Sequence, residues 1–352
     1  MSSSPASGEG SGYKLPGLGI EIAPINVPYH QRAETFAVLL WMFTFVFFGM
    51  GSVFLSIYLL LTDYYWLSVI LYAYMIYDRH TIHTGGRSWN WVGKLQFWKH
   101  MANYFPIRLH KTVDLDPEHN YMFGFHPHGL TVCGGIINFC TEATGFSQLF
   151  PGITPHLLAL VGFFQYPFAR ELLLSIGMCA SSSDSCDDLL TKSSSSTAVV
   201  IVVGGAKEML ETQPHIHMTY LSRRKGFIRK AIQHGAHLVP VYSFGENDLY
   251  DHYIMPEGSW RRWLQVKLIK VVGFPLAIFR GRGIFNYTFG FLPYRRPINT
   301  VVGRPINVKQ NPCPTKEDID ETHRIYMDSL TSLFDEYKER FSLGKEEKLK
   351  II

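Results

Sequence analysis

The chain has 352 residues, more than a minimal domain needs, which favours one large domain with appendages. A hydrophobic content of 47% and an aromatic content of 14% are high for a soluble protein, yet charged residues recur through the C-terminal three-quarters, which argues against a polytopic transporter. A formal net charge of +4 is too mildly basic to indicate a nucleic-acid partner.

The first 34 residues are polar and begin with a Ser- and Gly-rich stretch, Met1–Gly19. Such a composition buries too little apolar surface to fold, so we predict a disordered or polar tail over residues 1–34. No apolar segment follows the start directly, so the pattern is not that of a signal peptide.

The next stretch, up to residue 78, is the most apolar part of the chain. No charged residue occurs in 35–62 or in 64–77, and Asp63 separates the two runs. A membrane helix needs about 20 apolar residues to cross a hydrocarbon core of about 30 Å. We therefore predict a membrane hairpin of two helices, Phe36–Tyr58 and Leu59–Tyr77. The second helix is short for a span, so a re-entrant hairpin in one leaflet and a buried helix pair of a soluble core are alternatives.

Basic and aromatic residues follow the predicted hairpin: Arg79, Arg87, Lys94 and Lys99, with Trp89, Trp91 and Trp98 among them. Because loops rich in Lys and Arg stay on the cytosolic side, we expect the following domain to be cytosolic. The cysteines agree with a reducing compartment, since they are odd in number and form no CxxC pair. We expect reduced, mostly buried thiols at Cys133, Cys140, Cys179, Cys186 and Cys313.

A short apolar strand, Tyr121–Phe125, ends in His126-Pro127-His128-Gly129. Pro127 restricts its own backbone and the residue before it, and Gly129 lets a backbone approach closely. Imidazoles held at a sheet edge in this way are typical of a catalytic base. Two ordinary histidines and two metal ligands are the alternatives. The other histidines are scattered without a Cys or carboxylate pattern, so we predict no metal site.

Two further strands predict the fold class. The β-branched strand Ala198–Val203 ends in Gly204-Gly205-Ala206-Lys207-Glu208, and Leu238–Tyr242 follows an amphipathic segment, 227–232. Apolar strands that alternate with helices predict an α/β domain with a mostly parallel sheet. Arg223, Arg224 and Lys225 precede the helical segment, where the helix dipole would favour a phosphate; a solvated basic face is the alternative.

The C-terminal region carries a capping box, Thr315 and Asp318, which predicts a helix with an apolar stripe to Phe341. A basic tail, residues 346–352, ends the chain. Lys348 and Lys350 resemble a di-lysine retrieval signal of endoplasmic reticulum membrane proteins, although a charged tail produces this pattern by chance.

The His126–Gly129 tetrad resembles the signature of the type 2 diacylglycerol acyltransferase family, which includes monoacylglycerol and wax-alcohol acyltransferases. The resemblance covers about Leu95 to Phe341 and includes further ordered blocks, namely Tyr104-Phe105-Pro106, Phe150–His156, Phe244–Tyr250 and Val301–Ile306. It implies a glycerolipid-acyltransferase-like domain over residues 79–345, preceded by the membrane hairpin. The implied reaction transfers an acyl group from acyl-CoA, as co-substrate, to a neutral lipid alcohol without a further cofactor.

The resemblance also implies site roles. His128 is the expected general base, because plant members replace the first histidine and keep the second, and His126 would position its neighbour or the thioester. The wider superfamily pairs its histidine with an aspartate five positions later, but Thr131 and Cys133 occupy those positions here. Glu208 is the expected substitute. The remaining residues implied to bind substrate are Pro127, Gly129, Gly204, Gly205, Arg223, Arg224, Lys225 and Asn247.

We therefore expect a diacylglycerol acyltransferase of the endoplasmic reticulum membrane, or of the lipid-droplet surface, with a cytosolic catalytic domain. Monoacylglycerol or a long-chain alcohol is the alternative acceptor, and oligomerisation is left open. A non-catalytic lipid-droplet protein would explain the hairpin but not the tetrad. A membrane esterase would need a Gly-x-Ser-x-Gly elbow, which the chain lacks.

Overall fold

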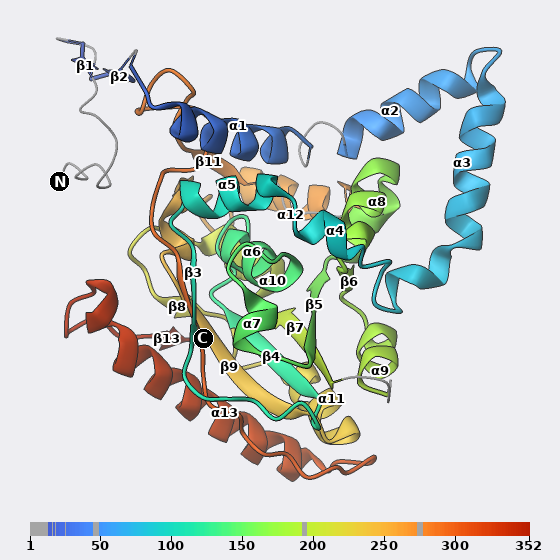
Figure 1. Cartoon of the computed structure of the whole chain (residues 1–352), viewed down its shortest axis with the longest axis vertical. Coiled ribbons are helices and arrows are strands. Elements are labelled where there is room, and N and C mark those ends of the chain that lie inside the picture. The colour runs from blue at the N-terminus through green and yellow to red at the C-terminus, as the bar shows by residue number, and fades with distance from the viewer. Residues whose placement is uncertain are drawn as a thin grey trace.

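The fold is built on one seven-stranded sheet with helices on both faces, as Figure 1 shows for a computed structural model of the chain. The structure describes residues 13–15, 17, 19–24, 26–44, 49–191, 196–272 and 277–352. Most of the predicted Ser- and Gly-rich tail lies outside these residues. The strands of the sheet are β3 (Arg108–Lys111), β4 (Tyr121–His126), β5 (Ile153–Ala159), β6 (Cys179–Ala180), β7 (Ser196–Val202), β9 (His237–Phe244) and β12 (Asn299–Val302).

The strand order is β3-β12-β9-β4-β7-β5-β6, and the five strands from β9 to β6 run parallel. Only β12 and β3 run the other way, since β12 pairs antiparallel with β9 and parallel with β3. In the middle of the sheet, Phe123 of β4 lies opposite Val200 of β7 and Val239 of β9. The prediction of an α/β fold with a mostly parallel sheet is confirmed.

The sheet separates two apolar cores because successive side chains of a strand point to opposite faces. On β4, Phe123 and Phe125 belong to one core and Met122 to the other. The first core is covered by α1 (Tyr29–Phe43), α5 (Gln96–Tyr104), α6 (Cys133–Cys140), α7 (Phe146–Leu149) and α8 (Pro167–Ser175). The second is covered by α9 (Ser183–Thr191), α11 (Gly226–His234) and α13 (Lys316–Tyr337). Four of the five cysteines are buried and Cys313 is exposed, as expected.

The predicted helix Phe36–Tyr58 is wrong, because two helices occupy its place. The first, α1, lies on the body of the domain, where Trp41 packs edge-on against Trp98 with ring centroids 5.3 Å apart. Buried Glu34 also forms an ion pair with Arg295. These contacts join segments that are far apart in the chain. The uncharged run from which the membrane helix was predicted therefore could not reveal them.

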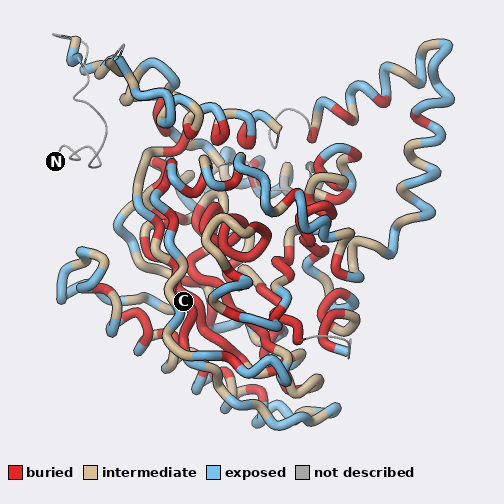
Figure 2. Tube along the Cα trace, in the orientation of Figure 1, coloured by how far each residue is buried: buried red, intermediate tan, exposed pale blue. Residues whose placement is uncertain are grey.

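The second helix, α2 (Gly49–Leu60), and α3 (Tyr65–Tyr77) form a pair that projects from the body at the upper right of Figure 1. The hydroxyl of Ser68 donates to the carbonyl of Ser56 at 2.9 Å and joins the two helices. Figure 2 shows most of the pair as exposed or intermediate. In the part of the chain that the structure describes, no helix combines the length and the apolar character that crossing a membrane requires.

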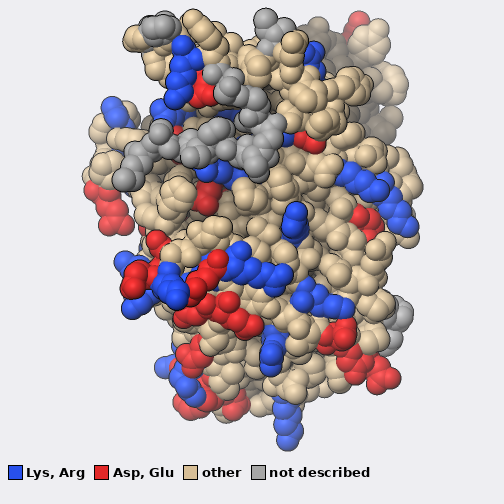
Figure 3. Space-filling model, turned by 60° about the vertical axis from the view of Figure 1, so that its left-hand side comes forward, with Lys and Arg blue, Asp and Glu red and all other residues tan. Residues whose placement is uncertain are grey.

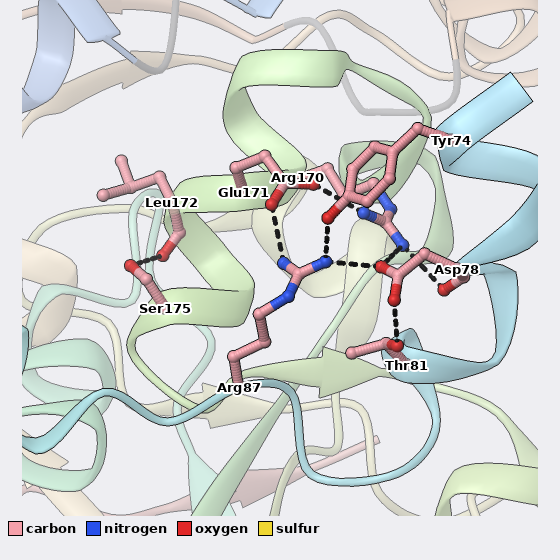
Figure 4. A network of polar contacts seen from close by, with 8 residues as sticks. All are labelled: Tyr74, Asp78, Thr81, Arg87, Arg170, Glu171, Leu172 and Ser175. Atoms are coloured by element: carbon pink, nitrogen blue, oxygen red, sulfur yellow. Dashed lines mark hydrogen bonds and ion pairs between the residues drawn. The ribbon is translucent and has the colours of Figure 1, made fainter. Parts of the chain in front are cut away.

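An ion-pair network holds the base of α3 against α8 (Figure 4). The carboxylate of Asp78 accepts from both Arg87 and Arg170, and Arg87 also pairs with Glu171 at 2.6 Å. Burial favours a higher pKa for Asp78, but hydrogen bonds from Thr81 and Arg170 and the charges of both arginines outweigh it and lower the pKa. The projecting pair is therefore anchored at its C-terminal end by charge.

The C-terminal helix α13 begins at the predicted capping box: the Thr315 hydroxyl accepts from the Asp318 N–H at 3.1 Å, and the Asp318 carboxylate accepts from the Thr315 N–H. Acidic and basic side chains are interspersed over the lower half of Figure 3, without separation by sign. Beyond α13, the predicted basic tail contains β13 (Lys350–Ile351), which pairs in parallel with β8 (Met218–Thr219).

Candidate active site

Three loops with polar residues meet at the carboxyl edge of the sheet. They follow β4, β7 and β9, which are neighbouring parallel strands, so their ends lie side by side. The β4 loop carries His126–Gly129, the β7 loop carries Gly204–Glu208, and the β9 loop carries Gly245–Asn247. Sites of open parallel sheets form at such edges. The sequence thus placed the tetrad and the Gly204–Glu208 segment correctly relative to the strands.

His126 is fully buried, and both of its ring nitrogens are hydrogen bonded. Nδ1 lies 2.9 Å from the Thr219 hydroxyl, and Nε2 lies 3.0 Å from the Tyr326 hydroxyl. Because Thr219 donates to the Glu208 carboxylate at 2.9 Å, it must accept from Nδ1–H. The Tyr326 hydroxyl beside Nε2 donates to the Gly124 carbonyl at 3.1 Å. Burial lowers the pKa of His126 to about 3. A neutral, fully bonded imidazole has no nitrogen left for a substrate proton.

His128 lies in a different environment two residues further on. Its side chain is partly exposed, and Nδ1 is 3.0 Å from the carbonyl of Gly129, which fixes Nδ1 as the donor. Among the described residues Nε2 makes no hydrogen bond, so its lone pair is open. Burial lowers the pKa of His128, while the charge of Glu208 opposes this shift.

Glu208 lies in α10 (Gly205–Glu211) and connects the two histidines. Its carboxylate accepts from the backbone N–H of His128, from the Thr219 hydroxyl and from the Tyr220 N–H at 2.7 Å. Three donors satisfy a carboxylate that is almost completely buried. Gly204 is required beside it, because a Cβ there would lie 2.0 Å from the Glu208 carboxylate. Glu208 thus holds the backbone of His128, and the hydrogen bond of the imidazole among the described residues goes to the Gly129 carbonyl instead.

The predicted basic residues lie beside this site to different degrees. Arg223 and Arg224 are exposed in front of α11, and Arg224 reaches the carbonyl of Gly204 at 3.4 Å. Lys225 is paired with Asp320 at 2.6 Å. Asn247 is buried and donates to the carbonyl of Ile216, so it supports a neighbouring loop. The structure therefore brings Arg224 to the Gly204–Glu208 loop and ties Lys225 to α13.

Three site residues were not foreseen from the sequence as members of the site. Tyr326 was predicted only as part of an apolar stripe, and Thr219 belongs to no motif. Glu246 lies within a recognised block, yet only the structure shows that it is buried and accepts from the Gly134 N–H at 2.9 Å. Burial raises the pKa of Glu246 to about 7.

Gly129 and Gly134 leave the room that Glu246 occupies. A Cβ on Gly129 would lie 2.6 Å from the Glu246 side chain, and one on Gly134 would lie 2.6 Å from its carboxylate. The tetrad is therefore held between two buried carboxylates, Glu208 on one side and Glu246 on the other. Within the described ranges, no group of three or more His, Cys, Asp or Glu side chains is arranged to hold a metal ion.

This arrangement defines an α/β protein with a histidine site at the carboxyl edge of a mostly parallel sheet. The chain belongs to the diacylglycerol acyltransferase family, since the family profile described as "Diacylglycerol acyltransferase" matches residues 57–352. The resemblance inferred from the tetrad and the ordered blocks is thereby confirmed.

Curated relatives match most of the chain. It is 44% identical to 2-acylglycerol O-acyltransferase 1 of Bos taurus, over 94% of this chain and 99% of that protein. It is 44% identical to diacylglycerol O-acyltransferase 2 of Homo sapiens, over 91% of this chain and 83% of that protein. The crystal structure of the 1-acyl-sn-glycerophosphate (LPA) acyltransferase PlsC from Thermotoga maritima covers 86% of this chain and 97% of its own, at 10% identity and a TM-score of 0.39, too distant a likeness to support any inference.

Proposed function

We propose that the protein is an acyl-CoA-dependent O-acyltransferase that esterifies diacylglycerol to triacylglycerol, with His128 as general base. The observation that carries the proposal is the open Nε2 of His128 at the sheet edge, in a chain of the diacylglycerol acyltransferase family. His126 is the poorer choice for a base, because both its nitrogens are engaged.

The proposed reaction has two steps. The acceptor hydroxyl attacks the thioester carbonyl while Nε2 of His128 takes its proton, a form of catalysis worth about 10²–10⁴ in rate. The tetrahedral intermediate then collapses, the C–S bond breaks, and CoA leaves as a thiol after taking the proton back from His128. Backbone N–H groups of the loop 129–132 would stabilise the oxyanion by about 3 kcal/mol.

Glu208 supports this cycle electrostatically. Its charge raises the pKa of His128 against the effect of burial, so it favours the imidazolium that forms when the proton is transferred. Its hydrogen bond to the His128 N–H also fixes the backbone of the base. Glu208 thus takes the place of the missing superfamily aspartate through a different contact.

The basic residues are proposed to hold the CoA phosphates. Arg224 is the main candidate, because it is exposed beside the N-terminus of α11 and reaches the Gly204 carbonyl. An Arg224→Gln variant should raise KM for acyl-CoA with little change in kcat. Arg229→Gln, an equal change at an exposed position of α11, is the control. Equal effects of the two variants would contradict this assignment.

The acceptor is proposed to be a neutral lipid. The Gly204–Glu208 loop contains no arginine, and its one lysine, Lys207, lies over the ring of Tyr220 at 4.4 Å. Monoacylglycerol is the second candidate, because relatives named 2-acylglycerol O-acyltransferase 1 match over 98–99% of their length. A long-chain alcohol is a third acceptor to compare.

The deciding experiment measures purified full-length protein in micelles with labelled acyl-CoA and each acceptor in turn. We expect diacylglycerol to be acylated far faster than lysophosphatidic acid, with monoacylglycerol next. Equal rates with lysophosphatidic acid and diacylglycerol would overturn the neutral-acceptor proposal, and Arg224 would then be the residue to test as a phosphate ligand.

Membrane attachment is part of the proposal. The α2–α3 pair carries exposed apolar side chains such as Phe54, Leu55 and Leu61, so we propose that it inserts into the endoplasmic reticulum membrane and leaves residues 79–345 in the cytosol. Asn286 of the Asn-Tyr-Thr sequon should then stay unglycosylated, and a glycan on Asn286 would contradict this topology.

A further inference from the structure

The helix α12 (Trp260–Val272) has its polar and apolar sides reversed over residues 260–268, relative to an ordinary surface helix. Trp260 and Trp263 are 70% and 62% exposed, and Leu264 and Val266 are exposed beside them. The side toward the protein carries Gln265, only 4% exposed, whose amide oxygen accepts from Arg262 at 3.1 Å. A helix that packs on a core places its apolar stripe inward, so this outward face is made for contact with something apolar.

Exposed apolar side chains recur further along the chain, from Ile278 to Phe291. Among the described residues between 258 and 291, nine large apolar side chains are exposed. They are Trp260, Trp263, Leu264, Val266, Ile278, Ile284, Phe285, Phe289 and Phe291. Single exposed apolar residues are normal on a protein surface, but nine within one short stretch indicate an interaction surface.

The charge of the same stretch indicates the partner. Residues 258–291 contain six Lys or Arg and no Asp or Glu. Arg262 and Arg280 are neutralised by Glu211 and Asp251. Arg261 and Lys267 are exposed and lie over the rings of Trp260 and Trp263, at 5.6 and 5.5 Å. Aromatic rings flanked by cations suit the boundary between acyl chains and anionic headgroups.

We propose that the outward side of α12, together with the exposed apolar residues of the loop 284–291, is a second docking surface for a bilayer that contains anionic lipid. It extends the membrane attachment proposed for the α2–α3 pair, and it would hold the catalytic domain down on the surface from which the acceptor is drawn. A second protein copy would leave the excess of cations on this face unmatched, because the partner would present the same charges.

Depth-dependent quenching tests the surface in the full chain. A single cysteine for a fluorescent dye is placed at Leu264 in a Cys313→Ser background, since the other four cysteines are buried. The same dye at Lys345, whose side chain is 80% exposed beyond α13, is the matched control. A third dye at Leu61, 83% exposed between α2 and α3, reports on the attachment of the helix pair.

In vesicles of phosphatidylcholine and phosphatidylserine with brominated acyl chains, we expect the dyes at Leu264 and Leu61 to lose most of their emission and the dye at Lys345 to keep it. A quenched Leu61 dye with an unquenched Leu264 dye would overturn the second surface and leave the first attachment intact. If neither is quenched, membrane attachment itself is wrong. A Leu264 signal that follows protein concentration and not lipid would assign the face to a second copy.

Charge reversal supplies an independent readout. Arg261→Glu with Lys267→Glu should raise KM for diacylglycerol in anionic vesicles and leave kcat for a soluble short-chain acceptor unchanged. Lys345→Glu reverses one charge at the control position and should alter neither value. An unchanged KM in the double variant would contradict the role of anionic headgroups.

Discussion

The carboxyl edge of the sheet and the stretch 258–291 place polar and apolar side chains in opposite ways. At the sheet edge, Glu208 and His126 are buried, and both are hydrogen bonded to side chains of the protein. Along 258–291, tryptophan and phenylalanine side chains face outward while Gln265 is buried. The first region is organised internally for chemistry, and the second is incomplete without an external apolar partner. Substitutions in the first region should therefore change turnover or folding stability. Substitutions in the second region should change contact with lipid.

The largest effect is expected from His128→Ala, which removes the open nitrogen of the buried region. Activity should fall by about 10²–10⁴ while the protein stays folded and membrane-bound. His126→Ala should cost less activity but more stability, because it empties a buried site and removes one hydrogen-bond partner each from Thr219 and Tyr326. Turnover in vesicles and thermal unfolding measure the two effects. A His128 variant that keeps most of its activity would falsify the proposed base.

The contrast between the two histidines shows what the sequence could predict. The parallel sheet, the strand before the tetrad and the capping box depend on local patterns, and each was predicted. The environment of His126 depends on Thr219 and Tyr326, which lie far along the chain and reach it only through the folding of β8 and α13. The position of α1 depends on Trp41 meeting Trp98, which no local pattern encodes.

The composition of residues 258–291 distinguishes the outward apolar face from the rest of the chain, but a search for membrane helices does not detect it. Residues 258–291 combine six cations, no acid and many aromatics, but no run in them is long and uncharged enough to suggest a membrane helix. Only the burial pattern shows that the apolar side chains face outward. Average hydrophobicity cannot distinguish a buried stripe from an exposed one.

A smaller effect, in stability alone, is expected from Glu246→Gln. Burial raises the pKa of Glu246 from an ordinary value of 4.5 to about 7, so the folded protein holds a proton there that the unfolded chain loses. The contribution of this proton to the free energy of unfolding is complete below pH 4.5 and is lost as pH rises through about 7. By linkage it amounts to about 3 kcal/mol.

The measurement compares unfolding free energies of Glu246→Gln and the parent protein from pH 4.5 to 7.5. Burial lowers the pKa of His126, so His126 makes the stability depend on pH in the opposite direction. Only the difference between variant and parent therefore isolates the contribution of Glu246. The variant should lose less stability than the parent over this range. Parallel curves would show that Glu246 is ionised throughout.

Glu208→Gln tests how tightly the buried region is coupled to the base. In the glutamine, one carboxylate oxygen is replaced by an NH₂ group, which can only donate. In either orientation of the amide this group faces another donor, either the His128 N–H or the donors of Thr219 and Tyr220. Losing a hydrogen bond to a charged group costs about 1.5–3 kcal/mol. We expect kcat to fall by an amount that corresponds to this loss of free energy. We also expect the pH–rate profile to shift to lower pH, because the charge that raises the pKa of His128 is gone. A fall in kcat with no pH shift would indicate a structural role only.

The smallest effect is expected from Tyr326→Phe. The hydroxyl of Tyr326 lies 3.0 Å from Nε2 of His126 and donates to the Gly124 carbonyl at 3.1 Å, so its removal deletes both contacts at the end of the network. Removing one neutral partner costs about 1 kcal/mol. Tyr337→Phe on the same helix is the matched control, because its hydroxyl makes no hydrogen bond with the described residues. If Tyr326→Phe is as stable as this control, the Tyr326 hydrogen bond does not contribute to holding His126. If it also lowers kcat well beyond its effect on stability, the orientation of His126 is transmitted through Thr219 and Glu208 to His128, and the buried region acts as one unit.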